Sequence, residues 1–154
     1  MYERILVPVD GSEPSKRGVE EAIRLAKDQN ATIRLVHVVD ELIMSGGLGG
    51  AMAYTGDLTE QLRAAGQDIL ARADALLQEA GMRSESAMLE HLGGPAAPLI
   101  VDEARNWKAD VIVLGTHGRR GLRRLVLGSD AEQIVRTAPV PVLLVRVPGA
   151  DETR

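Results

Sequence analysis

The sequence predicts an open α/β domain, in which a five-stranded parallel sheet carries helices on both faces. Short apolar runs rich in branched residues alternate with segments of helical periodicity, and this alternation favours parallel strands joined by right-handed crossovers. Some of these runs are almost continuously apolar, as expected of strands covered on both faces. With 154 residues, 45% of them hydrophobic, the chain has the size of one domain. We expect that domain to span residues 1–148, followed by a short polar tail at 149–154.

The first strand is expected at residues 5–9, where an apolar run stops at Asp10, Gly11 and Ser12. These three residues have the composition of a turn and a helix cap. From Ser12 the periodicity becomes helical, and we expect this helix to end at Asn30. Its apolar face would consist of Val19, Ala22, Ile23 and Ala26.

The second strand is expected at residues 31–39, and a long amphipathic helix at 58–80 ends before Gly81. Between them lies a glycine-rich loop, residues 44–56. It does not form a complete dinucleotide fingerprint, because Met52 stands where a third glycine would be required. The loop is either a ligand-lining lid or a passive connection.

The third strand, expected at residues 84–92, has polar interruptions that suit a sheet edge. The third helix is expected at 96–108, with Trp107 as a packing residue rather than a binding residue. The remaining strand, helix and strand are expected at residues 111–114, 130–137 and 140–147.

The stretch between the fourth strand and the fourth helix predicts a ligand site. An apolar run ends at Gly115, and after a loop Gly128 and Ser129 open a helical segment. Unpaired amides at a helix N-terminus, beside glycines that allow close approach, form an anion site. Ligands of open parallel sheets bind beyond the carboxyl ends of the strands. The strand ends at Asp10, Asp40 and Gly115 should therefore converge, and we interpret the site as a phosphate cradle.

The composition excludes several classes of function. Without cysteine, the chain has no disulfide, thiolate metal site or cysteine nucleophile. It shows neither a signal-peptide pattern nor a run of membrane-spanning length, so we expect a cytoplasmic protein without membrane contact. A net charge of −4 and 2% aromatic residues argue against nucleic acid as a partner. One local basic cluster is either a solvated face or a binding patch, and it consists of Arg119, Arg120, Arg123 and Arg124.

Three motifs carry a resemblance to a known family. They are the spacing G-x2-G-x9-G-S from Gly115 to Ser129, the segment VPVDGS at 7–12, and the segment APVPVLLV at 138–145. Together they resemble the universal stress protein family over essentially the whole chain, and in particular its subgroup that binds ATP with a divalent metal. The resemblance implies a Rossmann-like sheet of the adenine nucleotide α-hydrolase type, ordered 3-2-1-4-5, and a homodimer.

The resemblance also implies roles for individual residues. Asp10 would meet the ribose hydroxyls or the adenine, and backbone groups of Val38 would meet the adenine edge. Pro8, with Val9 beside it, would shape the base pocket. The loop would approach the ribose and α-phosphate, and the helix start would hold the β- and γ-phosphates. The loop contributes Gly115 and Gly118, with charge from His117 and Arg119, and the helix start contributes Gly128 and Ser129.

Two residues at the helix start leave alternatives open. Ser129 forms a capping box with Glu132, so its hydroxyl would serve the helix, a phosphate, or both. Asp130 stands where the family commonly has a small or apolar residue. Its carboxylate favours a helix N-terminus, yet it could repel a triphosphate or help to hold magnesium. We include Asp130 in the site and expect ATP to bind, with Mg2+ held through the nucleotide phosphates.

The expected function is that of an ATP-binding stress protein with a nucleotide-dependent regulatory role. The sequence has neither a Walker phosphate loop nor a nucleophile elbow, so no catalytic residue is assigned. Slow ATP hydrolysis stays open, because Asp10, Asp40 or Asp130 could orient water or metal. One alternative is a stress protein that acts through protein contacts without nucleotide, and another is a slow metal-dependent ATPase.

The fifth strand predicts a homodimer contact. It is apolar and lies at a sheet edge in the implied order, where unpaired backbone groups can pair with a second chain. Pro139 and Pro141 limit pairing near its start. The stretch 142–147 is left for an antiparallel two-fold contact.

Overall fold

The computed structural model describes residues 1–40, 56–91, 93–116 and 127–147, and in these the strands and helices alternate. The elements are β1 (Arg4–Pro8), α1 (Glu13–Ala26), β2 (Thr32–Asp40), α2 (Gly56–Glu79), β3 (Arg83–His91), α3 (Ala97–Trp107), β4 (Val111–Thr116), α4 (Ser129–Thr137) and β5 (Val142–Arg146). All strand pairs are parallel, and the sheet order is β3-β2-β1-β4-β5. The predicted fold class and strand order are therefore confirmed, and β3 and β5 form the two edges.

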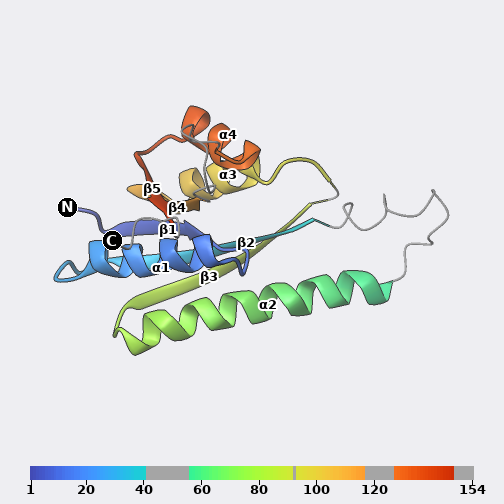
Figure 1. The fold of residues 1–154 in the computed structure, drawn as a ribbon, viewed down its shortest axis with the longest axis horizontal. Coiled ribbons are helices and arrows are strands. Elements are labelled where there is room, and N and C mark those ends of the chain that lie inside the picture. Colours follow the sequence, from blue (N-terminus) through green and yellow to red (C-terminus); the bar gives the residue numbers. More distant parts are fainter. Residues whose placement is uncertain (41–55, 92, 117–126, 148–154) are drawn as a thin grey trace, which may run out of the picture.

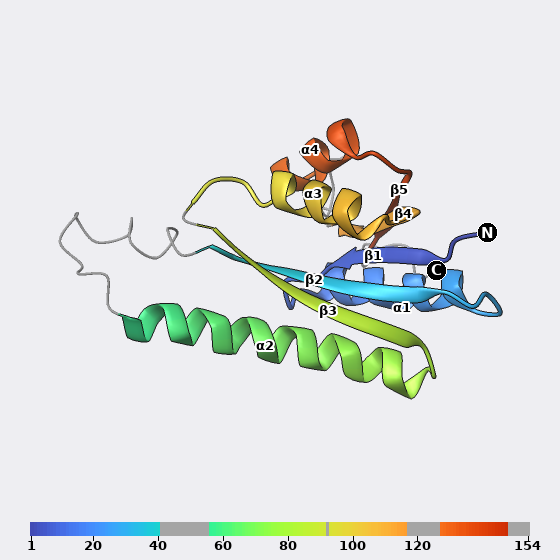
Figure 2. The same ribbon diagram turned by 180° about the vertical axis from the view of Figure 1, so that it is seen from behind.

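The sheet lies between two pairs of helices. α1 and α2 cover one face, and α3 and α4 cover the other (Figure 1), as the view from behind also shows (Figure 2). β1, at the centre, alternates between the two cores: Ile5 and Val7 pack under α1 and α2, whereas Leu6 packs under α3 and α4. All three side chains are 0% exposed. This burial on both faces fixes the position of the turn that follows β1.

The first helix is shorter than the sequence suggested. Its N-cap is Ser12, but the helix ends at Ala26 rather than at Asn30. Asp28 adopts a left-handed conformation with φ of 62°, which a continuing helix cannot contain. The predicted end of this helix was therefore wrong by one turn.

Trp107 packs at the end of the sheet where β1 begins. Its ring is 7% exposed, and the Arg4 guanidinium lies 4.3 Å from the ring centroid. The indole nitrogen donates a hydrogen bond of 2.9 Å to Glu85 Oε2. The predicted packing role is confirmed.

In the same described ranges, no helix is long and apolar enough to cross a membrane.

Candidate functional site

A cleft of about 250 Å³ lies at the carboxyl ends of β1 and β4, where the strand order changes direction. Ligands of open parallel sheets bind at this position. The strand ends β1 and β2 form one side of the cleft, and the starts of α3 and α4 form another. Six predicted site residues line it: Pro8, Val9, Asp10, Val38, Gly115 and Asp130.

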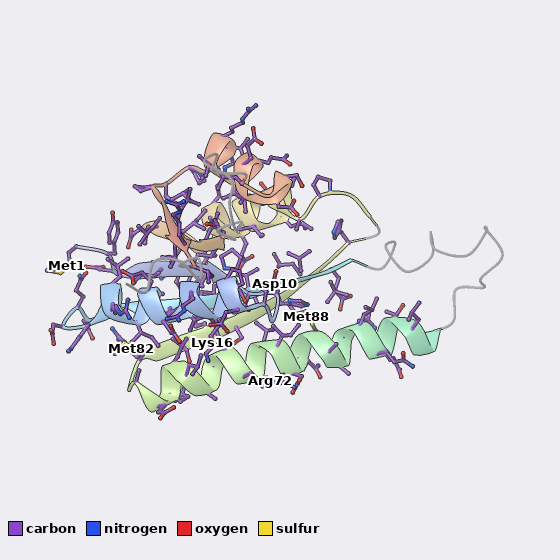
Figure 3. The ribbon with its side chains drawn as sticks, in the orientation of Figure 1. Met1, Asp10, Lys16, Arg72, Met82 and Met88 are labelled. Carbon is purple, nitrogen blue, oxygen red and sulfur yellow. The ribbon has the colours of Figure 1, made fainter. Side chains whose placement is uncertain are left out.

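The turn from β1 to α1 carries Asp10, which is labelled in Figure 3 and lines the cleft. Ser12 donates its backbone N–H to Asp10 Oδ1 at 2.9 Å, and Ser12 Oγ in turn accepts from Ser15 N at 3.3 Å. Gly11 between them has φ of +81°, a conformation that favours glycine. Partial desolvation raises the pKa of Asp10, but hydrogen bonds from Ser12 and Ser15 outweigh it, so the net pKa lies below its ordinary value. The turn therefore presents an ionised carboxylate.

Gly115 is required by packing at the end of β4. A Cβ added to this residue would lie 1.7 Å from the carbonyl oxygen of Pro14 in the first turn of α1. Gly18, one turn later in α1, also faces the Gly115 backbone, since its own added Cβ would lie 3.1 Å from Gly115 N. The close approach of two backbones thus accounts for Gly115 without any ligand.

Val38 presents backbone groups that β1 does not pair. The β1–β2 ladder ends at the pair of Pro8 and Val36, after which Val9 N donates to Val36 O at 2.8 Å. In a strand, residues two apart point their backbone groups to the same side, so Val38 points toward β1 beyond its end. The next acceptor in such a ladder would be Val9 O, but in the described chain no bond joins it to Val38 N, and it accepts instead from His37 Nδ1 at 2.8 Å. The Val38 edge therefore faces the cleft without a strand partner in the described chain.

The start of α4 differs from the predicted capping box. Gly128 is the N-cap, because Glu132 N donates to Gly128 O at 2.9 Å. Ser129 is consequently the first helical residue and makes no side-chain cap, so the capping-box prediction was wrong. A Cβ added at Gly128 would meet nothing within 4 Å among the described atoms. Gly128 and Ser129 directly precede Asp130 but are not among the residues that line the described cleft.

Asp130 contacts a second helix. Its Oδ1 accepts a hydrogen bond of 3.1 Å from the backbone N–H of Ala97, the first residue of α3. The side chain is partly buried and lines the cleft. The carboxylate thus connects the N-terminal turns of α3 and α4.

Three predicted site residues, His117, Gly118 and Arg119, lie outside the described residues, and so does the side chain of Asp40. The convergence of Asp10 with Gly115 is confirmed, since both line the cleft. Sequence reasoning missed several lining residues. Ser15, one helical turn after Ser12, and His37, next to Val38, could have been found from their positions in the sequence. The apolar wall of Ala96, Ile100, Ala131 and Ile134 depends on tertiary packing.

A larger groove of about 360 Å³ separates α1 from α2. Its lining is mostly apolar, with Lys16 and Arg72 on the two helices beside it (Figure 3). Of the predicted site residues only Val9 lines this groove. We therefore take the smaller cleft, where the polar strand ends converge, as the candidate site.

The fold and the cleft define an open α/β protein whose candidate ligand site lies at the switch point of a parallel sheet. Residues 1–146 match the universal stress protein family, and the chain belongs to that family. The universal stress protein MJ0531 of Methanocaldococcus jannaschii is 37% identical over 149 residues, covering 96% of this chain and 84% of the relative.

Two solved structures share the fold. The universal stress protein from Archaeoglobus fulgidus in complex with dAMP has a TM-score of 0.66 at 23% identity, covering 93% of this chain and 97% of that chain. A family protein from Arabidopsis thaliana with AMP bound has a TM-score of 0.65 at 20% identity, covering 99% of this chain and 95% of that chain.

Proposed function

We propose that the cleft binds an adenine nucleotide, with ATP as its ligand, and that the protein has a nucleotide-dependent regulatory role. The observation that carries this proposal is the unpartnered backbone edge of Val38, which lines the same cleft as the Asp10 carboxylate. The nucleotides named for the related structures, dAMP and AMP, support adenine as the base.

Recognition of the base would use the backbone of Val38. Adenine offers both donors and acceptors along its edge, and a strand residue offers one N–H and one C=O on the same side. In the described chain Val9 O accepts from His37 Nδ1, and no backbone hydrogen bond joins Val9 to Val38, so the Val38 edge is left for a ligand. Apolar neighbours such as Pro8 and Ile100 would cover the faces of the base.

Recognition of the ribose would use Asp10. Its pKa is lowered, so the carboxylate stays ionised near neutrality and can accept hydrogen bonds from two hydroxyls. The phosphates would extend toward Gly128 and Ser129 at the start of α4, where the N-cap makes no side-chain bond and an added Cβ would meet none of the described atoms within 4 Å.

Magnesium in this proposal is bound by the nucleotide phosphates. Mg2+ prefers six oxygen ligands and usually keeps several waters, so phosphate oxygens with one protein carboxylate would suit it. Asp130 is the carboxylate that the cleft offers on the side of α4. In the ranges that the structure describes, no three His, Asp or Glu side chains are grouped to hold a metal.

The test is isothermal titration of adenosine, AMP and ATP, each with and without Mg2+. Asp10→Asn keeps an acceptor for Ser12 N but loses the charge, and we expect it to weaken all three ligands by about tenfold. Asp102→Asn is the matched control, because this exposed carboxylate pairs with Arg105 on α3 and does not line the cleft. If no adenine ligand binds under either condition, the proposal fails, and a role through protein contacts alone becomes the better explanation.

Slow hydrolysis and regulation need separate experiments. A single-turnover assay that detects no ADP above the uncatalysed background removes the ATPase alternative. Pull-downs with and without ATP test whether partner binding depends on the nucleotide. Partners that bind equally in both conditions would contradict the regulatory role.

We also propose that the protein pairs as a homodimer through β5. This strand pairs with β4 on one side and is a sheet edge on the other. Leu143 in this strand is 37% exposed, although it is apolar. An antiparallel contact between two such edges would satisfy the outer backbone groups and cover these side chains.

A further inference from the structure

Two helices begin at one wall of the cleft. α3 starts at Ala97 and α4 starts at Ser129, and both starts lie next to lining residues. Neither N-cap residue, Ala96 or Gly128, makes a side-chain hydrogen bond to its helix. Because the amides and the macrodipole make a helix N-terminus positive, two positive helix ends meet at this wall.

The carboxylate of Asp130 lies at the N-terminal ends of both α3 and α4. It belongs to the first turn of α4, and its Oδ1 accepts the Ala97 N–H of α3 at 3.1 Å. The next residue of α3, Pro98, has no N–H to offer. One side chain of the protein therefore occupies the place where two helix ends would attract an anion.

The described walls contain no cationic side chain of lysine or arginine to offset this charge. The two acidic residues among the lining residues are Asp10, just after β1, and Asp130, in the first turn of α4. Asp102, on α3, does not line the cleft and is paired with Arg105. An anionic ligand group that enters the described cleft thus meets two carboxylates and no lysine or arginine among the described lining residues.

We propose that Asp130 selects nucleotides by charge, so that each phosphate not neutralised by a divalent cation lowers the affinity of the cleft. This inference rests on the proposed nucleotide function. Two unit charges about 6 Å apart, at an effective dielectric constant of about 40, change a binding constant by about tenfold. ATP is then accepted chiefly as its magnesium complex, whereas adenosine is indifferent to Asp130.

The test compares wild type with Asp130→Asn. An asparagine side-chain oxygen can still accept from Ala97 N, so the contact between the helices is kept while the charge is removed. Dissociation constants are measured for adenosine, AMP and ATP in EDTA, and for ATP with Mg2+, at constant ionic strength. Removing the charge should strengthen metal-free ATP by about tenfold, AMP by about threefold and adenosine not at all. The benefit for ATP should shrink when Mg2+ is present.

Asp102→Asn changes the net charge by the same amount as Asp130→Asn, but away from the cleft. It should leave all four dissociation constants unchanged. The melting temperature of Asp130→Asn, measured without ligand, checks that the fold is intact. An equal effect on adenosine and ATP, or no effect on either, overturns the charge selection but leaves nucleotide binding in place. Failure of wild type to bind every ligand, adenosine included, overturns the proposed function and this inference together.

Discussion

Replacing Gly115 by alanine should destabilise the protein in the absence of any ligand. The added Cβ would lie 1.7 Å from the Pro14 carbonyl oxygen and 2.2 Å from the Pro14 carbonyl carbon. These are backbone atoms, so no side-chain rotation can relieve the overlap. Either α1 or the end of β4 must move, and both are anchored in the same apolar core through Val19 and Val113.

The expected loss of unfolding free energy is about 3 kcal/mol, at the upper end of the usual cost of overpacking. In a protein of about this size, each kcal/mol lowers the melting temperature by about 2–4 °C, so we expect a drop of about 6–12 °C. Urea unfolding followed by circular dichroism measures the free energy, and calorimetry measures the melting temperature.

Gly128→Ala is the matched control, because it changes the last glycine of the same sequence motif. Among the described atoms its added Cβ meets nothing within 4 Å, and its φ of −59° suits alanine. We expect a loss below about 1 kcal/mol, from the poorer N-cap alone. If Gly115→Ala unfolds within about 1 kcal/mol of wild type, the contact with Pro14 relaxes without cost and our account of this glycine is refuted.

Three further predictions concern other parts of the molecule. The folded-state pKa of Asp10 is lowered, so its stabilising contribution is present above the ordinary value of 3.8 and is lost as the pH falls through the folded value. Acid unfolding of Asp10→Asn should therefore show a smaller fall in stability below that pH than wild type, and parallel curves would contradict this. Trp107→Phe removes the hydrogen bond to Glu85 and weakens the stacking of Arg4. It should lower the free energy of unfolding, measured in urea, by about 1.5 kcal/mol. No change in this free energy would refute the packing role. Leu143→Lys should convert the dimer into a monomer, as measured by light scattering. Val135→Lys is the control, because this exposed side chain lies on α4, and it should leave the dimer intact. A monomeric wild type would exclude the β5 contact.

The sequence predicted the elements of the fold because each is bounded by a local signal. Apolar runs predicted the positions of the strands, and Gly81 predicted the end of α2, where this glycine has a positive φ of 69°. The end of α1 was missed because Asp28, not a glycine, takes the left-handed conformation. An aspartate in the left-handed conformation gives no clear signal of a helix end in the sequence.

The part of the candidate site that was predicted also depends on local signals. Asp10 and Gly115 follow strands, and strand ends of a parallel sheet converge wherever the fold is right. The contact of Asp130 with Ala97 joins residues from two helices, and no periodicity in the chain records it. The bond from His37 to Val9 O, beside the open Val38 edge, is equally non-local. The one-residue shift of the N-cap from Ser129 to Gly128 is within the usual ambiguity of helix boundaries.

Trp107 also gives the protein a built-in optical reporter. It is the only tryptophan in the chain, it is 7% exposed, and it packs beside Arg4 at the opposite end of β1 from the cleft. Its fluorescence should shift to longer wavelength when the sheet unfolds and water reaches the ring. Nucleotide entering the cleft should leave the emission unchanged, so unfolding and binding can be followed separately in one sample. An emission change on adding nucleotide would mean that occupancy of the cleft is transmitted to the other end of the sheet, through β1 or through α3, which runs from the cleft to Trp107.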